Sequence, residues 1–394
     1  MKKYSITAFS IIGGITAIPL ATTAIVLSVP QGGSVDPTAE KIKFNETEQS
    51  AYMEKDGTIC AKYAFKLTNP AGEALKCEAN AQGEGQSLLG TIKTDIQMKD
   101  TEEGVLSLIC KPDDTTNIAI NQVFDIKIDF YDGQQKLKTP VLKMVCPLDI
   151  QNWESFSKVA DQGLAELKKK YKVSSFLGME KSVFINGKKY ETRIIGEEDD
   201  VTDKGVTVAL TFQFTESIGK WTWGPNNTDF INSNLNQTLI KFAGEMQTFV
   251  PIKTVSKYVY TNKGSSNASE KRESYTTSLF PLAICEITHK FKSIGDDRYI
   301  ADPMSYSYCE GWRIDEHEGS SQYDLFAEIE NNDDDSDTHL KEAMRSKGPD
   351  PVAYWLRSNA WLMPNNTFGR VTSSGYIVNQ SSPDGLDTLP CFCI

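Results

Sequence analysis

Histidine is scarce in this chain of 394 residues, which contains only His289, His317 and His339. No two of them have the spacing of metal ligands, and the sequence has no CxxC pair, so the common kinds of zinc site are disfavoured. A GxSxG turn, a phosphate-binding glycine loop and a dinucleotide fingerprint are also missing. We therefore predict no metal ion, no cofactor and no catalytic residue, and we do not expect an enzyme.

Positive charge is in deficit, because 41 lysines and arginines stand against 53 aspartates and glutamates, which gives a net charge of −12. The only basic cluster is Lys168, Lys169 and Lys170. Nucleic-acid binding needs a concentrated positive face. The composition therefore predicts a folded protein with no nucleic-acid partner.

One long uncharged segment follows Lys2 and Lys3. Within it, TAFSIIGGITAIPLATTAIVLSV is long enough to cross a hydrocarbon core of about 30 Å as a helix. The positive residues in front of it orient the rest of the chain outside the cytoplasm. We predict that residues 1–30 are a signal anchor, with a cleaved signal peptide as the alternative. The protein is then membrane-anchored at the cell surface, or secreted if the segment is removed.

Cysteines are even in number and evenly divided between the two halves of the chain. An even count outside the cytoplasm is typical of a disulfide framework, and the two quartets are expected not to cross-pair. The alternative is that some of them are buried thiols that pack as small apolar side chains. The eight cysteines are Cys60, Cys77, Cys110, Cys146, Cys285, Cys309, Cys391 and Cys393.

Residues 31–40 are rich in proline, glycine and serine and are expected to be a linker. Residues 41–149 then contain short apolar runs that are bounded by turn residues. The run VFDIKIDFY alternates strictly from Phe124 to Phe130, which is typical of a half-buried strand. Several such strands in about a hundred residues predict an all-β immunoglobulin-like sandwich.

In residues 150–172 the apolar side chains recur every three to four residues, which predicts one amphipathic connecting helix capped by Asn152. Residues 173–394 mix a hairpin at Asn186-Gly187, alternating runs and short helical patterns without a βαβ rhythm. This mixture predicts an α+β domain. The predicted fold class is therefore multi-domain, with a membrane helix, an all-β sandwich and a C-terminal α+β domain.

Three polar or sulfur-rich segments could carry chemistry, and each has a simpler interpretation. The acidic run 315–318 is expected to be structural or solvated, because adjacent residues rarely converge on one ion. The run 330–337 is expected to be a solvated loop, since it lacks the glycine and the distal glutamate of an EF-hand calcium loop. In Cys391-Phe392-Cys393, strand alternation puts both sulfurs on one face and Phe392 on the other. The two thiols could hold a soft metal such as copper, but we favour a structural role at the end of the chain.

The second half resembles the uncharacterised bacterial surface-protein domain of unknown function 6273 over about residues 176–394. The resemblance is carried by Asn186-Gly187, Gly219-Lys220-Trp221, Phe230, Leu235-Asn236, SLFPLAICEI from Ser278 to Ile287, Glu310-Gly311, Tyr323, Phe326, YWLRS from Tyr354 to Ser358, Phe368, Val371, Gly375, Gly385, Pro390 and Phe392. The sequence departs from the family pattern at Tyr354, where the family has tryptophan, and at Asn359, where it has proline. Leu389 replaces an arginine, so any contact made by that arginine is in doubt.

The closing WLRS…V…G…F pattern is also similar to proteins of the C-type-lectin fold. One branch of that fold, the formylglycine-generating-enzyme-like group, uses a paired-cysteine copper site. The spacing of Cys391 and Cys393 differs from that site, so the activity is not carried over. Another branch comprises ligand-binding proteins diversified by retroelements, whose variable residues lie in this terminal stretch. The resemblance thus implies a lectin-like C-terminal domain.

Aromatic and amide side chains on loops of such a scaffold make an adaptable contact surface. We therefore predict a bacterial cell-surface ligand-binding or adhesion protein whose partner is an extracellular protein or glycan. The alternatives are a formylglycine-generating-type oxidase and a structural surface component without a specific ligand. The predicted ligand-binding residues are Asn359, Trp361, Met363, Asn365, Asn366, Tyr376 and Asn379.

Overall fold

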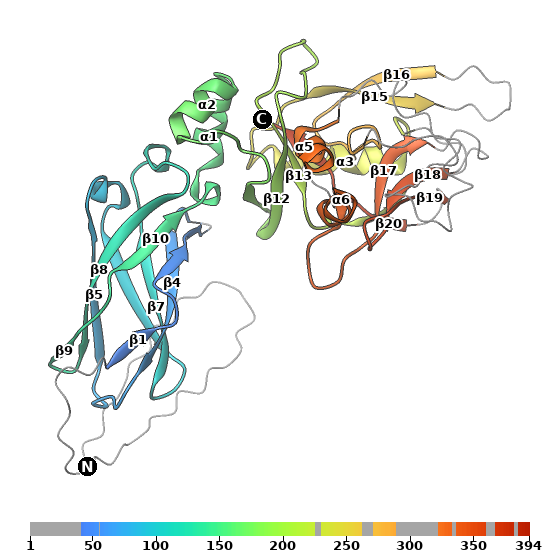
Figure 1. Cartoon of the computed structure of the whole chain (residues 1–394). Helices are drawn as coiled ribbons and strands as arrows, with labels where there is room; N and C mark the ends of the chain where they lie inside the picture. The colour runs from blue at the N-terminus through green and yellow to red at the C-terminus, as the bar shows by residue number, and fades with distance from the viewer. Residues whose placement is uncertain are drawn as a thin grey trace.

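The computed structural model describes residues 41–54, 56–224, 230–261, 271–288, 322–332, 336–359, 367–381 and 385–394. These residues form two lobes, an elongated β-sandwich and a broader C-terminal lobe, with two short helices, α1 and α2, beside the junction (Figure 1). The end of the chain lies close to these helices. Trp153 of α1 contacts Phe392 near the C-terminus, with ring centroids 5.9 Å apart.

Ten strands and three 3-10 turns build the first lobe. The strands are β1 (Ile42–Phe44), β2 (Glu48–Ser50), β3 (Tyr52–Met53), β4 (Ile59–Leu67), β5 (Leu75–Gln82), β6 (Ile92–Met98), β7 (Glu103–Cys110), β8 (Gln122–Asp132), β9 (Gln135–Leu137) and β10 (Leu142–Cys146). The turns are η1 (Gln86–Leu89), η2 (Thr115–Asn117) and η3 (Leu148–Ile150).

The strands of this lobe form two sheets. One has the order β1-β4-β7-β6 with β3 beside β4, and the other has the order β2-β10-β8-β5 with β9 beside β8. The predicted alternation on β8 is confirmed, because Phe124, Ile126, Ile128 and Phe130 are all at most 2% exposed. These side chains fill the space between the sheets together with Tyr63 and Phe65 of β4.

The predicted single helix over residues 150–172 is wrong, because the chain forms α1 (Trp153–Ala160) and α2 (Leu164–Tyr171). The break falls at Gly163, whose backbone has a φ of 102°, a conformation that an α-helix cannot contain. The predicted cap is confirmed, since the Asn152 side chain accepts hydrogen bonds from the N–H groups of Glu154 and Ser155.

Gly163 provides a prediction with a matched control. Gly163→Ala should lower the free energy of unfolding by about 1–2 kcal/mol, because a Cβ atom strains positive-φ backbone even where space is open. Gly244 also has no atom within 4 Å of a built Cβ, but it lies inside helix α3 (Asn234–Met246). Gly244→Ala should therefore raise stability by about 0.5–1 kcal/mol. Thermal unfolding of both variants checks the opposite signs, and equal shifts would contradict this account of the break.

The second lobe contains eleven described strands and three described helices. The strands are β11 (Glu180–Ile185), β12 (Lys188–Glu197), β13 (Leu210–Phe214), β14 (Lys220–Thr222), β15 (Val255–Thr261), β16 (Lys271–Thr277), β17 (Tyr354–Asn359), β18 (Thr367–Val371), β19 (Ile377–Ser381), β20 (Gly385–Asp387) and β21 (Cys391–Cys393). The helices are α3, α5 (Asp324–Asn332) and α6 (Ser336–Met344).

These strands form sheets in the orders β11-β12-β13-β21 and β14-β20-β17-β18-β19, and β15 pairs with β16 alone. The predicted hairpin at Asn186-Gly187 is confirmed, because Ile185 pairs with Lys188 and both turn residues have positive φ. One of the alternating runs, VTVALTFQF from Val206 to Phe214, forms a strand only from Leu210 onward, and Val206 is 62% exposed.

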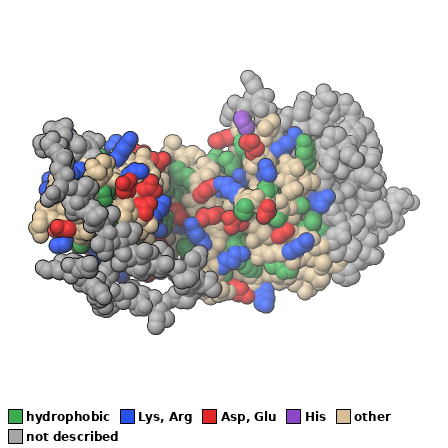
Figure 2. Space-filling view, turned by 90° about the horizontal axis from the view of Figure 1, so that it is seen from below, with side chains coloured by type: hydrophobic (Ala, Val, Ile, Leu, Met, Phe, Trp, Pro, Cys, Tyr) green, Lys and Arg blue, Asp and Glu red, His purple; other side chains and the backbone are tan. Residues whose placement is uncertain are grey.

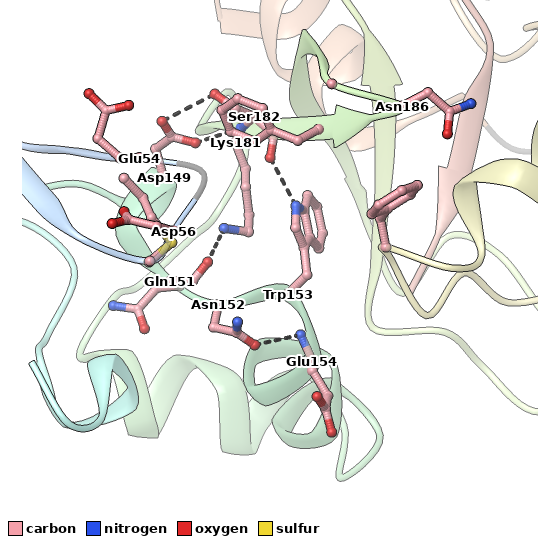
Figure 3. Close-up of a pocket in the computed structure, with 15 residues that line it drawn as sticks. Glu54, Asp56, Asp149, Gln151, Asn152, Trp153, Glu154, Lys181, Ser182 and Asn186 are labelled. Carbon is pink, nitrogen blue, oxygen red and sulfur yellow. Dashed lines mark hydrogen bonds between the residues drawn. The ribbon is translucent and has the colours of Figure 1, made fainter. Parts of the chain in front are cut away.

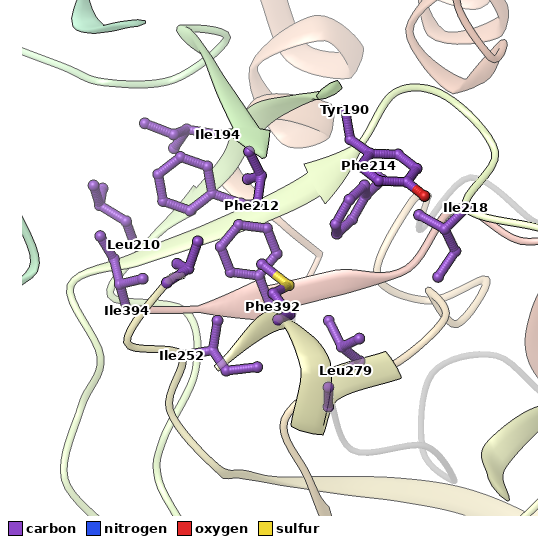
Figure 4. Packing of buried hydrophobic residues seen from close by; sticks show 14 of the residues in the cluster. Tyr190, Ile194, Leu210, Phe212, Phe214, Ile218, Ile252, Leu279, Phe392 and Ile394 are labelled. Atoms are coloured by element: carbon purple, nitrogen blue, oxygen red, sulfur yellow. The ribbon is translucent and has the colours of Figure 1, made fainter. Parts of the chain in front are cut away.

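The first of these sheets carries the central apolar cluster of the lobe (Figure 4). Phe392 of β21 stacks on Phe212 of β13, with centroids 5.1 Å apart and an interplanar angle of 9°. The cluster continues through α1 and α2 to Ile120 and Leu148 at the end of the sandwich. One continuous core therefore connects the two lobes.

The predicted fold class is wrong. It placed a membrane helix in front of the chain and an α+β lectin-like domain at its end, whereas the described chain is mostly β-sheet with five short α-helices. The longest of these, α3, has 13 residues, and none of the described helices is long and apolar enough to cross a membrane. The predicted anchor, residues 1–30, lies outside the described residues. The α+β prediction overestimated helix because apolar runs in the second lobe mostly pair as strands.

The predicted disulfide framework is also wrong, because no disulfide joins any two of the seven described cysteines. Six of the seven are buried, and Cys77 is half-buried. Burial raises the pKa of the Cys110 and Cys146 thiols to about 12, so both stay protonated and pack as small apolar groups. Cys309 lies outside the described residues.

Candidate functional site

The predicted ligand-binding residues fall largely outside the described chain. This holds for Trp361, Met363, Asn365 and Asn366, while Asn359 and Asn379 are described only by their backbone positions in β17 and β19. Tyr376 lies in the turn between β18 and β19, where it is half-buried and its ring lies 4.5 Å from the Lys341 ammonium. The binding surface at the closing segment therefore stays a prediction.

A network of charged side chains lies inside the second lobe. The Glu286 carboxylate accepts two hydrogen bonds from the Arg357 guanidinium, at 2.5 and 2.6 Å, and one from Lys257 at 2.8 Å. Lys257 also lies 2.5 Å from Asp200 and donates to the Tyr323 hydroxyl at 2.7 Å. All five side chains are at most 6% exposed.

Opposite charges compensate each other in this network. Burial by itself would raise the pKa of Glu286, but the charges of Arg357 and Lys257 lower it to about 2. Burial would likewise lower the pKa of Lys257, but Asp200 and Glu286 raise it. Glu286 and Lys257 therefore stay ionised, and the network is stable only while every partner is present.

The two closing cysteines point into the same core as this network. Cys391 and Cys393 belong to its apolar surroundings, whereas Phe392 faces the other core, so the predicted alternation is confirmed. Burial raises the pKa of both thiols, and the Cys393 thiol lies 3.4 Å from an Asp200 oxygen. Protonated, buried thiols are poor nucleophiles and poor metal ligands. The network has acid, base and thiol groups, but its arrangement suits a structural role.

An open cleft lies between the two lobes (Figure 3). Its volume is about 640 Å³, which is within the range of ligand-binding pockets. The sandwich contributes Met53, Glu54, Asp56 and Gly57, the connecting segment contributes Asp149 and residues 151–154, and the second lobe contributes Lys181, Ser182, Phe184, Asn186, Gly187 and Phe249. The lining residues are therefore spread along the chain from Met53 to Phe249.

Lys181 lies at the buried base of the cleft, where it is 1% exposed. Its ammonium group donates to the carbonyl of Gln151 and lies 4.7 Å from the ring centroid of Trp153. Figure 3 shows this side chain running beside Trp153 toward Gln151. Burial lowers the pKa of Lys181 to about 8, although the nearby Asp149 charge opposes the shift.

The pH dependence of stability should reveal Lys181. Between about pH 8 and pH 10.5 the unfolded chain keeps this proton while the folded chain has released it, so the stability contributed by Lys181 rises with pH. In Lys181→Met this rise should be missing. Urea unfolding of both proteins across that range measures the difference, and identical pH profiles would show that Lys181 titrates as it does in the unfolded chain.

Carboxylates outnumber cations among the described lining residues, since Glu54, Asp56, Asp149 and Glu154 face a single lysine. Hydrogen bonds from Thr58 lower the pKa of Asp56, and the hydrogen bond from Lys158 lowers that of Glu154. Gln151 adds an acceptor, because no described residue donates to its buried Oε1. The lining is therefore acceptor-rich, with apolar area from Met53, Trp153, Phe184 and Phe249.

Sequence reasoning missed both the buried network and the cleft. A signal for the network was present, because Lys257, Glu286 and Arg357 interrupt the apolar runs TVSKYVY, SLFPLAICEI and YWLRS. A charge inside an apolar strand needs a buried partner. The cleft gave no such signal, since its lining segments are far apart along the chain.

Comparison with known proteins adds no relative, because no protein-family model, curated protein or solved structure matches this chain. The resemblance to the bacterial surface domain therefore stays a prediction. In the structure, two of the motifs that carry this resemblance meet in the buried network, through Glu286 of SLFPLAICEI and Arg357 of YWLRS.

Proposed function

We propose that this chain is an extracytoplasmic ligand-binding protein and that the cleft between its lobes is the binding site. The observation that carries the proposal is the composition of the cleft. Aromatic side chains, carboxylates and an acceptor without a described donor converge there from both lobes. The continuous core from Ile120 to Phe392 would hold the two walls at a fixed distance, which reduces the ordering cost of binding.

The distribution of charge on the molecule agrees with recognition of a discrete ligand. On the face seen in Figure 2, the acidic and basic side chains of the described residues are interspersed over both lobes, without one large patch of either sign among them. Binding to a polyanion would need such a patch. A pocket that selects a ligand by a few polar groups and apolar walls does not.

The test uses the full chain on arrays of extracellular proteins, peptides and glycans. Hits are then measured by titration with two alanine variants of exposed apolar residues, Phe249→Ala in the cleft and Ile240→Ala on α3. Phe249→Ala should weaken binding about tenfold or more, and Ile240→Ala should leave it unchanged. Equal affinities of the two variants for every hit, or no hit at all, would reject the cleft as the binding site.

A further inference from the structure

Strand β11 forms one wall of the cleft and lies at the edge of its sheet, where β12 is its only partner among the described strands. The two-residue turn makes Ile185 and Lys188 a hydrogen-bonded pair, so Val183 and Tyr190, two residues further along, form the next one. The residues that alternate with these on β11, Phe184 and Ser182, therefore direct their backbone N–H and C=O groups away from β12.

The edge is closed at Ser182 and open at Phe184. The Ser182 N–H donates to Asp149 at 2.6 Å, and its C=O accepts from the Trp153 indole at 2.9 Å. In the described part of the chain, no residue hydrogen-bonds the outward backbone groups of Phe184. Phe184 is only half-buried and lines the cleft. An exposed strand edge of this kind is a template for an added strand.

The surroundings of this open edge define what can be added. Glu54 and Asp56 give the described lining a negative character, to which Glu154 adds although it also accepts a hydrogen bond from Lys158. The only lysine among the described lining residues, Lys181, is already bound to the Gln151 carbonyl. Phe184 and Phe249 supply apolar contact. A strand that alternates basic and apolar side chains would meet both features, because neighbouring side chains of a strand point to opposite faces.

We propose that the cleft binds an extended peptide segment of alternating basic and apolar residues, which adds to β11 through the backbone of Phe184. This inference rests on the proposed function and names its ligand class. The backbone groups of Phe184 supply affinity for any extended peptide. The carboxylates Glu54 and Glu154 select a basic one by charge complementarity.

The probe is a capped octapeptide of alternating valine and lysine, titrated into the full chain by fluorescence anisotropy. It should bind about tenfold or more tightly than the valine–glutamate peptide of equal length. N-methylation of alternate amides, which removes the main-chain donors, should abolish binding. In amide exchange, the N–H of Phe184 should become protected on binding, whereas that of Ile185 is already bonded within the hairpin.

The role of charge is also tested by neutralising carboxylates of the protein, in the cleft and, as a control, outside it. The double variant Glu54→Gln, Glu154→Gln should weaken binding of the lysine peptide about tenfold. The variant Glu102→Gln, Glu103→Gln changes the net charge equally at residues that do not line the cleft and should bind as the wild type does. Equal loss in both would show that only the overall charge of the molecule attracts the peptide, which overturns the proposal.

The outcomes separate this inference from the proposed function. One outcome is that the lysine peptide does not bind, whereas a glycan binds and Phe249→Ala weakens its binding. The cleft is then a binding site, and only the peptide proposal fails. If the peptide binds equally with and without N-methyl groups, strand addition is wrong. If Phe249→Ala changes the binding of neither ligand class, both proposals fail.

Discussion

A Glu286→Gln variant is expected to lose about 3–5 kcal/mol of unfolding free energy. Glu286 is 0% exposed and accepts hydrogen bonds from Arg357, Lys257 and the backbone N–H of Ala283. The neutral amide would leave the two cations facing Asp200 alone in a site that water does not reach. Because all six tryptophans lie beyond residue 150, tryptophan fluorescence in urea reports on this half of the chain.

Two comparisons separate loss of the network from a general effect of losing a carboxylate. Glu102→Gln removes a half-exposed carboxylate from the sandwich and should change stability by no more than about 0.5 kcal/mol. The double variant Glu286→Gln, Arg357→Met should cost less than the sum of its single changes, because a balanced Lys257–Asp200 pair remains. Strict additivity would mean that Glu286 and Arg357 do not act as a pair.

The same network predicts an acid-sensitive stability. The pKa of Glu286 is lowered from 4.5 to about 2 in the folded chain, so its stabilising contribution is complete above about pH 4.5 and is lost as the pH falls toward 2. The difference in stability between wild type and Glu286→Gln should therefore shrink over that range.

A Phe392→Ala variant is expected to lose about 3–5 kcal/mol, as large-to-small changes in a core do. Phe392 is 0% exposed and packs against Phe212, Phe214 and Trp153 at centroid distances of 5.1, 5.7 and 5.9 Å. The cavity would open where β21, β13 and α1 meet, so we expect the junction of the two lobes to loosen as well.

The control for this variant is Ile240→Ala, which shortens a side chain that is 59% exposed and should change stability within about 0.5 kcal/mol. Calorimetric melting of the two variants measures the difference. A loss below about 1.5 kcal/mol for Phe392→Ala would show that the neighbouring rings collapse into the cavity and that the contact is dispensable.

The sequence by itself determined the features that depend on neighbours along the chain. The period of two in VFDIKIDFY placed Phe124 and Phe130 on the buried face of β8, and Asn186-Gly187 placed the hairpin turn. The same alternation separated Phe392 from its flanking cysteines. These predictions succeeded because side-chain direction in a strand follows from local geometry alone.

Only the tertiary structure decided which distant residues meet. Glu286 and Arg357 are 71 positions apart, and their pairing depends on where β17 lies against the 279–288 segment. The cleft likewise joins Glu54 of the sandwich to Phe184 and Phe249 of the second lobe. The cysteine count suggested bridges, but whether two sulfurs meet depends on three-dimensional distance, and no described pair is bridged. Periodicity fixes which way a side chain points, whereas the packing of the lobes fixes what it contacts.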